Sequence, residues 1–357
     1  MKHEKQISFL AKAFIIVIIG ALIIAFLSLG RLTELLRQEK SINVLVWGQV
    51  LDKEFLSDFE HKTGIHVNMS YFESNEELLA KLYATESHDY DLIMPSDWAV
   101  ELLIKDGLVK KLDRNKIPVW DTVYPALCNH YFDPHNEYTI PFFWALLGLG
   151  VNTDFCDKGI LQPTWGLIFD ECLMPKRIGM LESPRALILI AALYLFGEVR
   201  PLTDNEVNEV KKILLKQKSH VEIYTDSRSE YVLASGEVSV GVVLSSDLFK
   251  VMKRFDAIDF IVPKEGAFAV IDSFAITKTS QKDDLVYPFL NYLFDPNVIK
   301  KYVNKFDFFS AVQLNVDYDD RFARLVEPTQ DIFKKIHFFE DVISKEVVND
   351  ILITLKS

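Results

Sequence analysis

The stretch YDLIMPSDWAVELLIKDG, residues 90–107, carries the pattern that decides the fold. Its first six residues, 90–95, are mostly apolar, as expected of a buried strand. Ser96 or Asp97 then offers a side chain that can cap the first turn of a helix, which the rest of the stretch predicts. A strand that leads directly into a helix is the repeating unit of an α/β protein.

Two units of the same kind precede this stretch. Residues 42–48, INVLVWG, predict a buried strand, and the helix after it ends at Gly64. Residues 65–72 predict a second strand, and Ser74 with Glu77 forms a capping box at the start of the next helix. Regular strand–helix alternation predicts a doubly wound sheet of parallel strands.

The pattern restarts in the second half of the chain, after a long apolar stretch at residues 138–153. A strand over 177–183 leads into a buried helix opened by Pro184, and residues 237–245 predict a further apolar strand. Residues 260–277 predict two antiparallel strands around a turn. Because no Gly/Ser linker or internal repeat separates the halves, we expect two lobes joined by more than one crossing strand.

Residues 1–40 do not share this pattern and are expected to be an N-terminal signal-anchor segment. An uncharged run at about 13–30 is just long enough to span a membrane, and the lysines before it favour a cytoplasmic N-terminus and export of the rest. A cleaved signal peptide is the alternative. The run ends in AFLSLGRL, without a clear cleavage site and without a cysteine to carry a lipid, so we expect an uncleaved anchor.

Charge and composition exclude several classes of protein. The 357 residues carry 39 Lys and Arg against 51 Asp and Glu, a net charge of −12, which argues against a nucleic-acid partner and suits a cationic ligand. The cysteines are Cys128, Cys156 and Cys172, an odd number for an exported protein; one disulfide with a free thiol is conceivable, and the sequence does not choose the pair. The absence of a CxxC motif argues against a structural zinc site.

Enzyme motifs are absent from the sequence. It contains no GxSxG, HExxH, Walker or GxGxxG pattern. Its histidines are dispersed, and adjacent carboxylates such as Asp319 and Asp320 are typical of solvated faces. We therefore expect no enzyme activity, no cofactor and no metal site.

Candidate ligand-binding residues follow the predicted strands, where a doubly wound sheet places its ligands. Trp47 ends the first strand, and Ser96, Asp97 and Trp98 follow the third and open a helix. Asp272 lies inside an apolar strand, where a carboxylate without a partner is unfavourable. Core packing would explain either tryptophan, and a structural salt bridge would explain Asp272. Together, these residues point to one cleft.

From residue 42 to its C-terminus the chain resembles the periplasmic spermidine/putrescine-binding proteins of ABC importers. The resemblance implies a type II periplasmic-binding-protein fold, in which two α/β lobes joined by a hinge enclose the ligand. Lobe 1 would comprise residues 42–143 and about 246–283, and lobe 2 residues 144–245 and about 284–357. The blocks that carry the resemblance are collinear: VLVWG (44–48), FEHKTGIHV (59–67), YFESNEELLAKL (71–82), YDLIMPSDWAVELLIKDGLVKKLD (90–113), FDPHNEYTIPFFWALLGLGVN (132–152), SGEVSVGVV (235–243) and VPKEGAFAVIDSFAI (262–276).

The resemblance also implies the ligand contacts. Trp47, Ser96, Trp98 and Asp272 fall on ligand-contacting positions of the family. A linear polyamine needs carboxylates for its ammonium groups and aromatic faces for its methylene chain, where cation–π attraction and apolar contact act together. Asp272 would face an ammonium group of the ligand.

The chain departs from the family at several of these positions. Ser183 and Ala186 stand where the family has two acidic residues that anchor a terminal amine. Leu244 and Val270 stand where the family has tryptophans, and Phe308 replaces a tyrosine. Loss of a carboxylate that pairs with a buried ammonium costs several kcal/mol, enough to change the preferred ligand.

The candidate ligand site therefore also includes Ser183, Phe308 and Glu182. Glu182 lies one residue before the position of the family's first acidic anchor, which it could replace. The resulting prediction is the periplasmic substrate-binding protein of an ABC importer, a monomer that delivers a polyamine or related small cation to a permease in the inner membrane. Two alternatives stay open: the same fold with a different small solute, or a membrane-tethered sensor or interaction module without transport. The ligand, the permease and signal cleavage also stay open.

Overall fold

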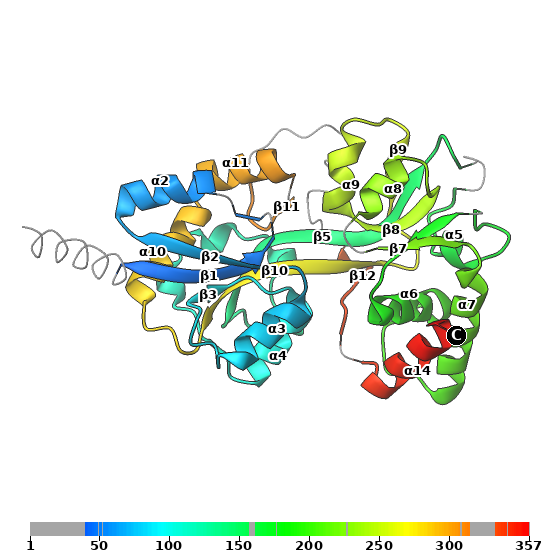
Figure 1. Cartoon of the computed structure of the whole chain (residues 1–357), viewed down its shortest axis with the longest axis horizontal. Helices are drawn as coiled ribbons and strands as arrows, with labels where there is room; N and C mark the ends of the chain where they lie inside the picture. Colours follow the sequence, from blue (N-terminus) through cyan, green and yellow to red (C-terminus); the bar gives the residue numbers. More distant parts are fainter. Residues whose placement is uncertain are drawn as a thin grey trace, which may run out of the picture.

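The structure is a computed structural model that describes residues 40–356 apart from 49, 52, 157–160, 176, 226–227, 308, 315–332 and 341 (Figure 1). The predicted membrane segment at about 13–30 and the candidate Phe308 lie outside the described residues. Among the residues that are described, no helix is both long and apolar enough to cross a membrane.

The described strands form one mixed sheet of twelve strands. The main path runs in the order β2 (His66–Phe72), β1 (Ser41–Trp47), β3 (Leu92–Ile93), β10 (Ala267–Thr277), β5 (Thr139–Asn152), β8 (Val240–Leu244), β6 (Ile178–Met180) and β7 (Val221–Tyr224). Four shorter strands pair with β5 or β10: β4 (Val109–Lys110), β9 (Ile258–Ile261), β11 (Phe309–Ser310) and β12 (Ile336–His337).

The sheet is parallel at its two ends and antiparallel in the middle. β1 pairs in parallel with β2 and β3, and β6 pairs in parallel with β7 and β8, as strand–helix alternation predicts. β5 and β10 run antiparallel to each other, β10 also to β3, and β5 also to β8. The sheet is therefore mixed. We call the two parallel ends the β1 half and the β6 half; β5 and β10 extend into both (Figure 1).

Helices cover both faces of the β1 half because side chains of β1 alternate between two core clusters. Val44 and Val46 pack with α2 (Lys53–Thr63), α10 (Asp283–Leu293) and α11 (Pro296–Phe306). Leu45 packs on the other face with α3 (Asn75–Ala84) and α4 (Asp97–Lys105). As predicted, Ser74 caps α3, since its hydroxyl accepts a hydrogen bond from the backbone N–H of Glu77.

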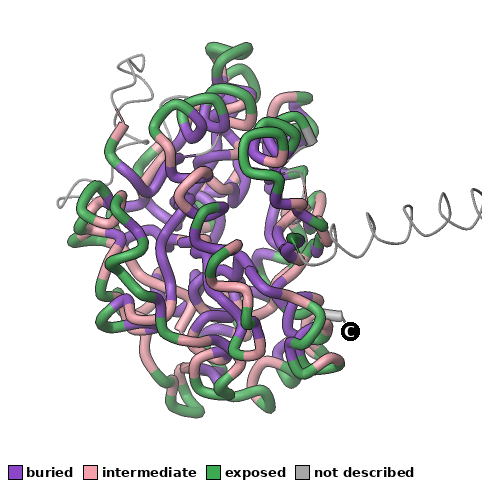
Figure 2. The backbone as a smooth tube through the Cα atoms, turned by 90° about the vertical axis from the view of Figure 1, so that its left-hand side faces the viewer, coloured by how far each residue is buried: buried purple, intermediate pink, exposed green. Residues whose placement is uncertain are grey.

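The β6 half is built in the same way. One face packs against α5 (Gly166–Phe169), α6 (Pro184–Phe196), α7 (Asp204–Lys218) and α14 (Lys345–Lys356), and the other against α8 (Ser229–Ala234) and α9 (Ser245–Met252). Helix α6 is mostly buried, begins at Pro184 as predicted, and ends at Gly197 with a φ of 75°. Figure 2 shows the buried backbone gathered in the interior, with exposed segments around it.

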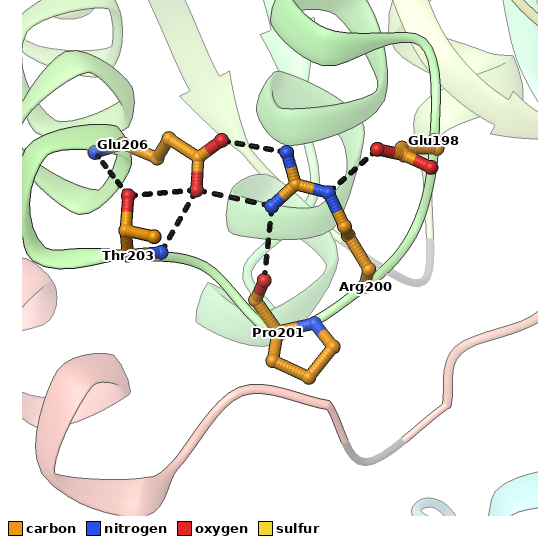
Figure 3. Close-up of polar contacts among 5 residues, drawn as sticks. All are labelled: Glu198, Arg200, Pro201, Thr203 and Glu206. Carbon is orange, nitrogen blue, oxygen red and sulfur yellow. Dashed lines mark hydrogen bonds and ion pairs between the residues drawn. The ribbon is translucent and has the colours of Figure 1, made fainter.

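The first turn of α7 shows how a solvent-facing helix is fixed at its end (Figure 3). The Thr203 hydroxyl accepts the backbone N–H of Glu206, and the Glu206 carboxylate accepts the backbone N–H of Thr203, which together form a capping box. Arg200 donates two hydrogen bonds to the same carboxylate, at 3.0 and 2.6 Å. Hydrogen bonding to Arg200, followed by that to Thr203, lowers the pKa of Glu206 to about 2.

Packing reverses two of the expected lobe assignments. Helices α10 and α11 pack in the core cluster of β1, although residues 284–357 were assigned to lobe 2. Helix α9 packs in a cluster with α8, and β9 pairs with the distal end of β5, although residues 246–283 were assigned to lobe 1. The reason is β10, which carries the chain from the β6 half into the β1 half, so the helices after it lie there.

The predicted hairpin over 260–277 is also absent. β9 and β10 both run antiparallel to β5, so they follow one another in the same direction. The loop between them is held by Glu265, whose carboxylate accepts hydrogen bonds from the Thr164 hydroxyl and the Trp165 backbone N–H. Alternation of apolar residues identified both strands but carried no information about their partner.

Candidate functional site

Asp272 lies where β10 passes between the two halves of the sheet. The pairing of β10 with β5 is irregular at this point, because Asp272 lies opposite Phe143 and the next residue, Ser273, lies opposite Pro141. Such bulges re-aim a side chain and are frequent near binding sites. Asp272 as a residue is half-buried, while most of β10 is buried.

Ser96 connects the end of β3 to this carboxylate. Its hydroxyl donates a hydrogen bond to Oδ1 of Asp272 at 2.5 Å, and the two residues also form an isolated antiparallel bridge. The backbone N–H of Ser273 donates to the carbonyl of Pro95 at 3.0 Å. The polar segment after β3 is therefore fixed against β10 by both side-chain and backbone hydrogen bonds.

Trp47 lies beside the same carboxylate at the end of β1. Its ring packs against Phe72, with centroids 4.5 Å apart, and its indole nitrogen is buried without a well-formed hydrogen bond. Burial raises the pKa of Asp272 to about 6, and the Ser96 hydroxyl and the Trp47 indole N–H oppose that rise. The charge of Asp247 adds to the rise. The structure thus brings Trp47, Ser96 and Asp272 together.

Asp97 is a second carboxylate at this place. Its side chain is only 1% exposed; Oδ1 accepts the backbone N–H of Trp98 at 2.7 Å, and Oδ2 has no partner in the described chain. Burial raises the pKa of Asp97 to about 8, and the charge of Asp272 adds to that effect. The sequence indicated its position after the third strand, at the start of a helix, but not its burial.

Trp98 follows in the first turn of α4. Its side chain is partly buried and packs against the cluster that contains Leu45 and the apolar residues of α3 and α4. The structure therefore places Trp98 next to Asp97 along the chain, with part of its surface accessible.

Glu182 and Ser183 lie in the other half, at the start of α6. The Ser183 hydroxyl accepts the backbone N–H of Ala186 at 3.4 Å, so this side chain caps the helix. Glu182 is exposed. Val270 and Leu244 are aliphatic and partly buried where the resemblance implies tryptophans.

Tyr131 was missed by the sequence analysis and lies within electrostatic reach of both halves. Its hydroxyl is buried and has no hydrogen-bond partner among the described residues. Burial raises the pKa of Tyr131, and the charges of Asp97, Glu101 and Glu340 add to the rise, while Arg185 opposes it. Nothing in the loop around Tyr131 has a sequence pattern that could have indicated this proximity.

Potential metal ligands, cysteines and surface cavities are further features of the described chain that bear on a ligand or cofactor site. No group of three or more His, Cys, Asp or Glu residues within it could hold a metal ion. All three cysteines are described, and no disulfide joins them. Two surface cavities, of about 550 Å³ between α2 and α11 and about 440 Å³ between α5, α6 and α7, lie away from Asp272.

Comparison with known proteins identifies the family. The family model described as bacterial extracellular solute-binding protein matches residues 88–347, well over half of the chain. The chain belongs to this family. The family's name describes binding of solutes and not catalysis.

Relatives of this solute-binding protein confirm the resemblance read from the sequence. The putrescine-binding periplasmic protein SpuD of Pseudomonas aeruginosa is 30% identical, over 86% of this chain and 88% of its own length. PotF of Escherichia coli, also a putrescine-binding periplasmic protein, is 30% identical, over 73% and 75%. The fold is similar to that of the substrate-binding protein PotD of Streptococcus pneumoniae, with a TM-score of 0.76, 21% identity and coverage of 89% and 98%.

Proposed function

We propose that this solute-binding protein captures a polyamine or a related small cation at Asp272, in a cleft between the β1 and β6 halves. The observation that carries the proposal is the environment of Asp272: a carboxylate of a half-buried residue, on a strand shared by both halves. No cation of the described chain contributes to its pKa or to that of Asp97. A bound ammonium group would supply the missing positive charge.

The aromatic residues fit the same ligand. Trp47 and Trp98 flank the polar segment, and both keep part of their surface accessible. An ammonium group over an indole face gains about 0.5–2 kcal/mol, and methylene groups gain from apolar contact with the same ring. The polyamine-binding relatives support this ligand class.

The resemblance to these relatives supports a role for the protein in transport of its ligand. We propose that contacts to both halves close the two lobes around the ligand, as in hinge closure, and that the closed form delivers it to an ABC permease in the inner membrane. The protein would act as a monomer in the periplasm, tethered through the apolar run at about 13–30. Mass measurement of the exported protein would distinguish an uncleaved anchor from a cleaved signal peptide.

The start of α6 favours a second candidate within the same fold. Ser183 and Ala186 provide no carboxylate there, and Arg185 is close enough to act on the pKa of Tyr131. A cation at the start of α6 would suit a solute that carries an acidic group beside its amine, such as an amino-acid-like compound. In this candidate, Asp272 still contacts the ammonium group of the solute. Only the group that binds the opposite end of the solute differs.

Calorimetric titration of the full-length chain in mild detergent tests the proposal. The ligands are putrescine, cadaverine, spermidine and spermine, followed by zwitterionic amino acids of similar length. Micromolar or tighter binding of a polyamine is expected. Binding of the zwitterions alone would favour the second candidate, and no heat with any amine, from a folded protein, would contradict both.

A further inference from the structure

Asp97 is a buried carboxylate that the fold leaves without a full set of partners. It is 1% exposed, and only Oδ1 accepts a well-formed hydrogen bond, from the adjacent backbone N–H of Trp98. Oδ2 accepts no well-formed hydrogen bond from any described residue, although the backbone N–H of Ile271 on β10 lies close enough to lower the pKa of Asp97. A buried polar atom without a partner is unfavourable, and in native proteins such an atom calls for an explanation.

A helix cap alone does not explain this burial. Asp204 occupies the same position in α7, as the first helical residue after a hydroxyl-bearing N-cap, and there the side chain is exposed. The helix dipole stabilises a carboxylate at that position without any need to bury it. Asp97 is instead enclosed between α4 and β10, beside the proposed ligand contact.

The groups that act on Asp97 do not include a cation. Asp272 on β10 opposes its ionisation, and its own charge acts on Tyr131 in the loop before β5. Around Asp272 itself, Trp47 and Ser96 favour the charged form and Asp247 on α9 disfavours it. The fold thus brings two carboxylates to one place, and no positive charge among the described residues lowers the pKa of either.

Further charged groups lie around Tyr131. Glu101, one turn further along α4, and Glu340 in the C-terminal segment both act on its hydroxyl, and Arg185 at the start of α6 opposes them. These three charges act on Tyr131, and among the described residues the charged group that acts on Asp97 itself is Asp272. Two neighbouring carboxylates cannot both ionise easily, and the more deeply buried one retains a proton.

We propose that Asp97 is a second acidic group of the ligand site, which holds a proton while the site is empty and releases it to solvent when an amine cation binds beside Asp272. The inference rests on the proposed function. On release the O–H bond of the carboxyl group breaks, its electron pair stays on Asp97, and the ligand's positive charge replaces that of the proton. Burial has raised the pKa of Asp97 to about 8, and a nearby ammonium group lowers it again.

The test is calorimetry of the full-length chain with putrescine, in two buffers of different ionisation enthalpy and at several pH values between 6.5 and 7.5. The wild-type protein is expected to release close to one proton, and its Kd to fall up to about tenfold per pH unit. Asp97→Asn should bind with little proton release and a nearly flat pH profile. The matched control Asp204→Asn should behave as the wild type does, and Asp97→Glu should restore the pH dependence.

The outcomes separate this inference from the proposed function. If the wild-type protein binds an amine and Asp97→Asn releases the same number of protons with the same pH dependence, the inference is overturned and the proposed function stands. Failure of the wild-type protein to bind any amine would overturn the proposed function, and the inference with it. If Asp97→Asn does not fold, an infrared difference spectrum of the wild-type protein decides: loss of a protonated carboxyl band on addition of putrescine supports the inference, and its absence overturns it.

Discussion

The Ser96 hydroxyl donates a hydrogen bond to Oδ1 of Asp272 at 2.5 Å, although 176 residues separate the two in the sequence. Ser96 occupies the N-cap position of α4, yet its side chain makes no capping hydrogen bond. A serine that caps a helix contributes about 1 kcal/mol to stability. Local rules of this kind are broken mainly at functional sites, so the lost cap is consistent with a serine that positions a ligand-binding carboxylate.

We expect Asp272→Asn to abolish binding of a cationic ligand while the protein stays folded. The substitution removes the charge that pairs with a buried ammonium group, and truncation of such a pair costs roughly 2–5 kcal/mol. This is a loss of about 30-fold or more in affinity, measured by calorimetry. Thermal unfolding without ligand provides the control, and unchanged affinity in a folded variant would remove Asp272 from the site.

Ser96→Ala is expected to shift the pH dependence of binding. Burial raises the pKa of Asp272 and the Ser96 hydroxyl lowers it, so removal of the hydroxyl raises the pKa further above about 6. More of the carboxyl group is then protonated at pH 6–7, and affinity for an amine should fall there more than at pH 8. Ser96→Thr keeps a hydroxyl and serves as the control; equal losses at all pH values would contradict a role through Asp272.

The sequence predicted part of this candidate site from two kinds of local signal. Trp47 and Ser96 follow strands, where an α/β sheet places its ligands. Asp272 lies within an apolar run, and a carboxylate there is unfavourable unless it has a hydrogen-bonding or charged partner. The alternation of strands and helices likewise predicted both parallel ends of the sheet.

The features that the sequence did not predict depend on contacts between segments that are far apart in the chain. The spacing of apolar residues carries no information about such contacts. Tyr131 reaches Asp97 from an irregular loop. Helices α10 and α11 pack with β1 only because β10 returns the chain to that half. The sequence places Asp97 after the third strand, where a cap or a ligand contact is expected, but its burial results from the approach of β10 and has no local signal.

Trp98→Ala is expected to weaken ligand binding by roughly 1–3 kcal/mol, the scale of a cation–π contact plus apolar burial. Its side chain is only partly buried, so the core contacts that it loses are limited. Calorimetry with the wild type's best ligand measures the effect, and Trp98→Phe should retain part of the affinity. A large drop in melting temperature with no change in affinity would instead assign Trp98 to core packing.

Asp97→Asn is expected to change how stability depends on pH, even without ligand. The pKa of Asp97 is raised in the folded protein to about 8, above its ordinary value of 3.8 in the unfolded chain. The folded state therefore binds the extra proton between about pH 4 and pH 8. Because of this, the free energy of unfolding falls as pH rises through that range, by up to about 1.4 kcal/mol per pH unit.

The asparagine variant lacks this penalty, so its stability relative to the wild type should increase steadily from pH 4 to pH 8 and then level off. Urea unfolding at intervals across this range measures the difference, with Asp204→Asn as the exposed control that should follow the wild-type curve. A constant difference between Asp97→Asn and the wild type would mean that Asp97 is already ionised at pH 4. Its burial would then have to be compensated by a partner, and the negative charge of the site would be present before any ligand binds.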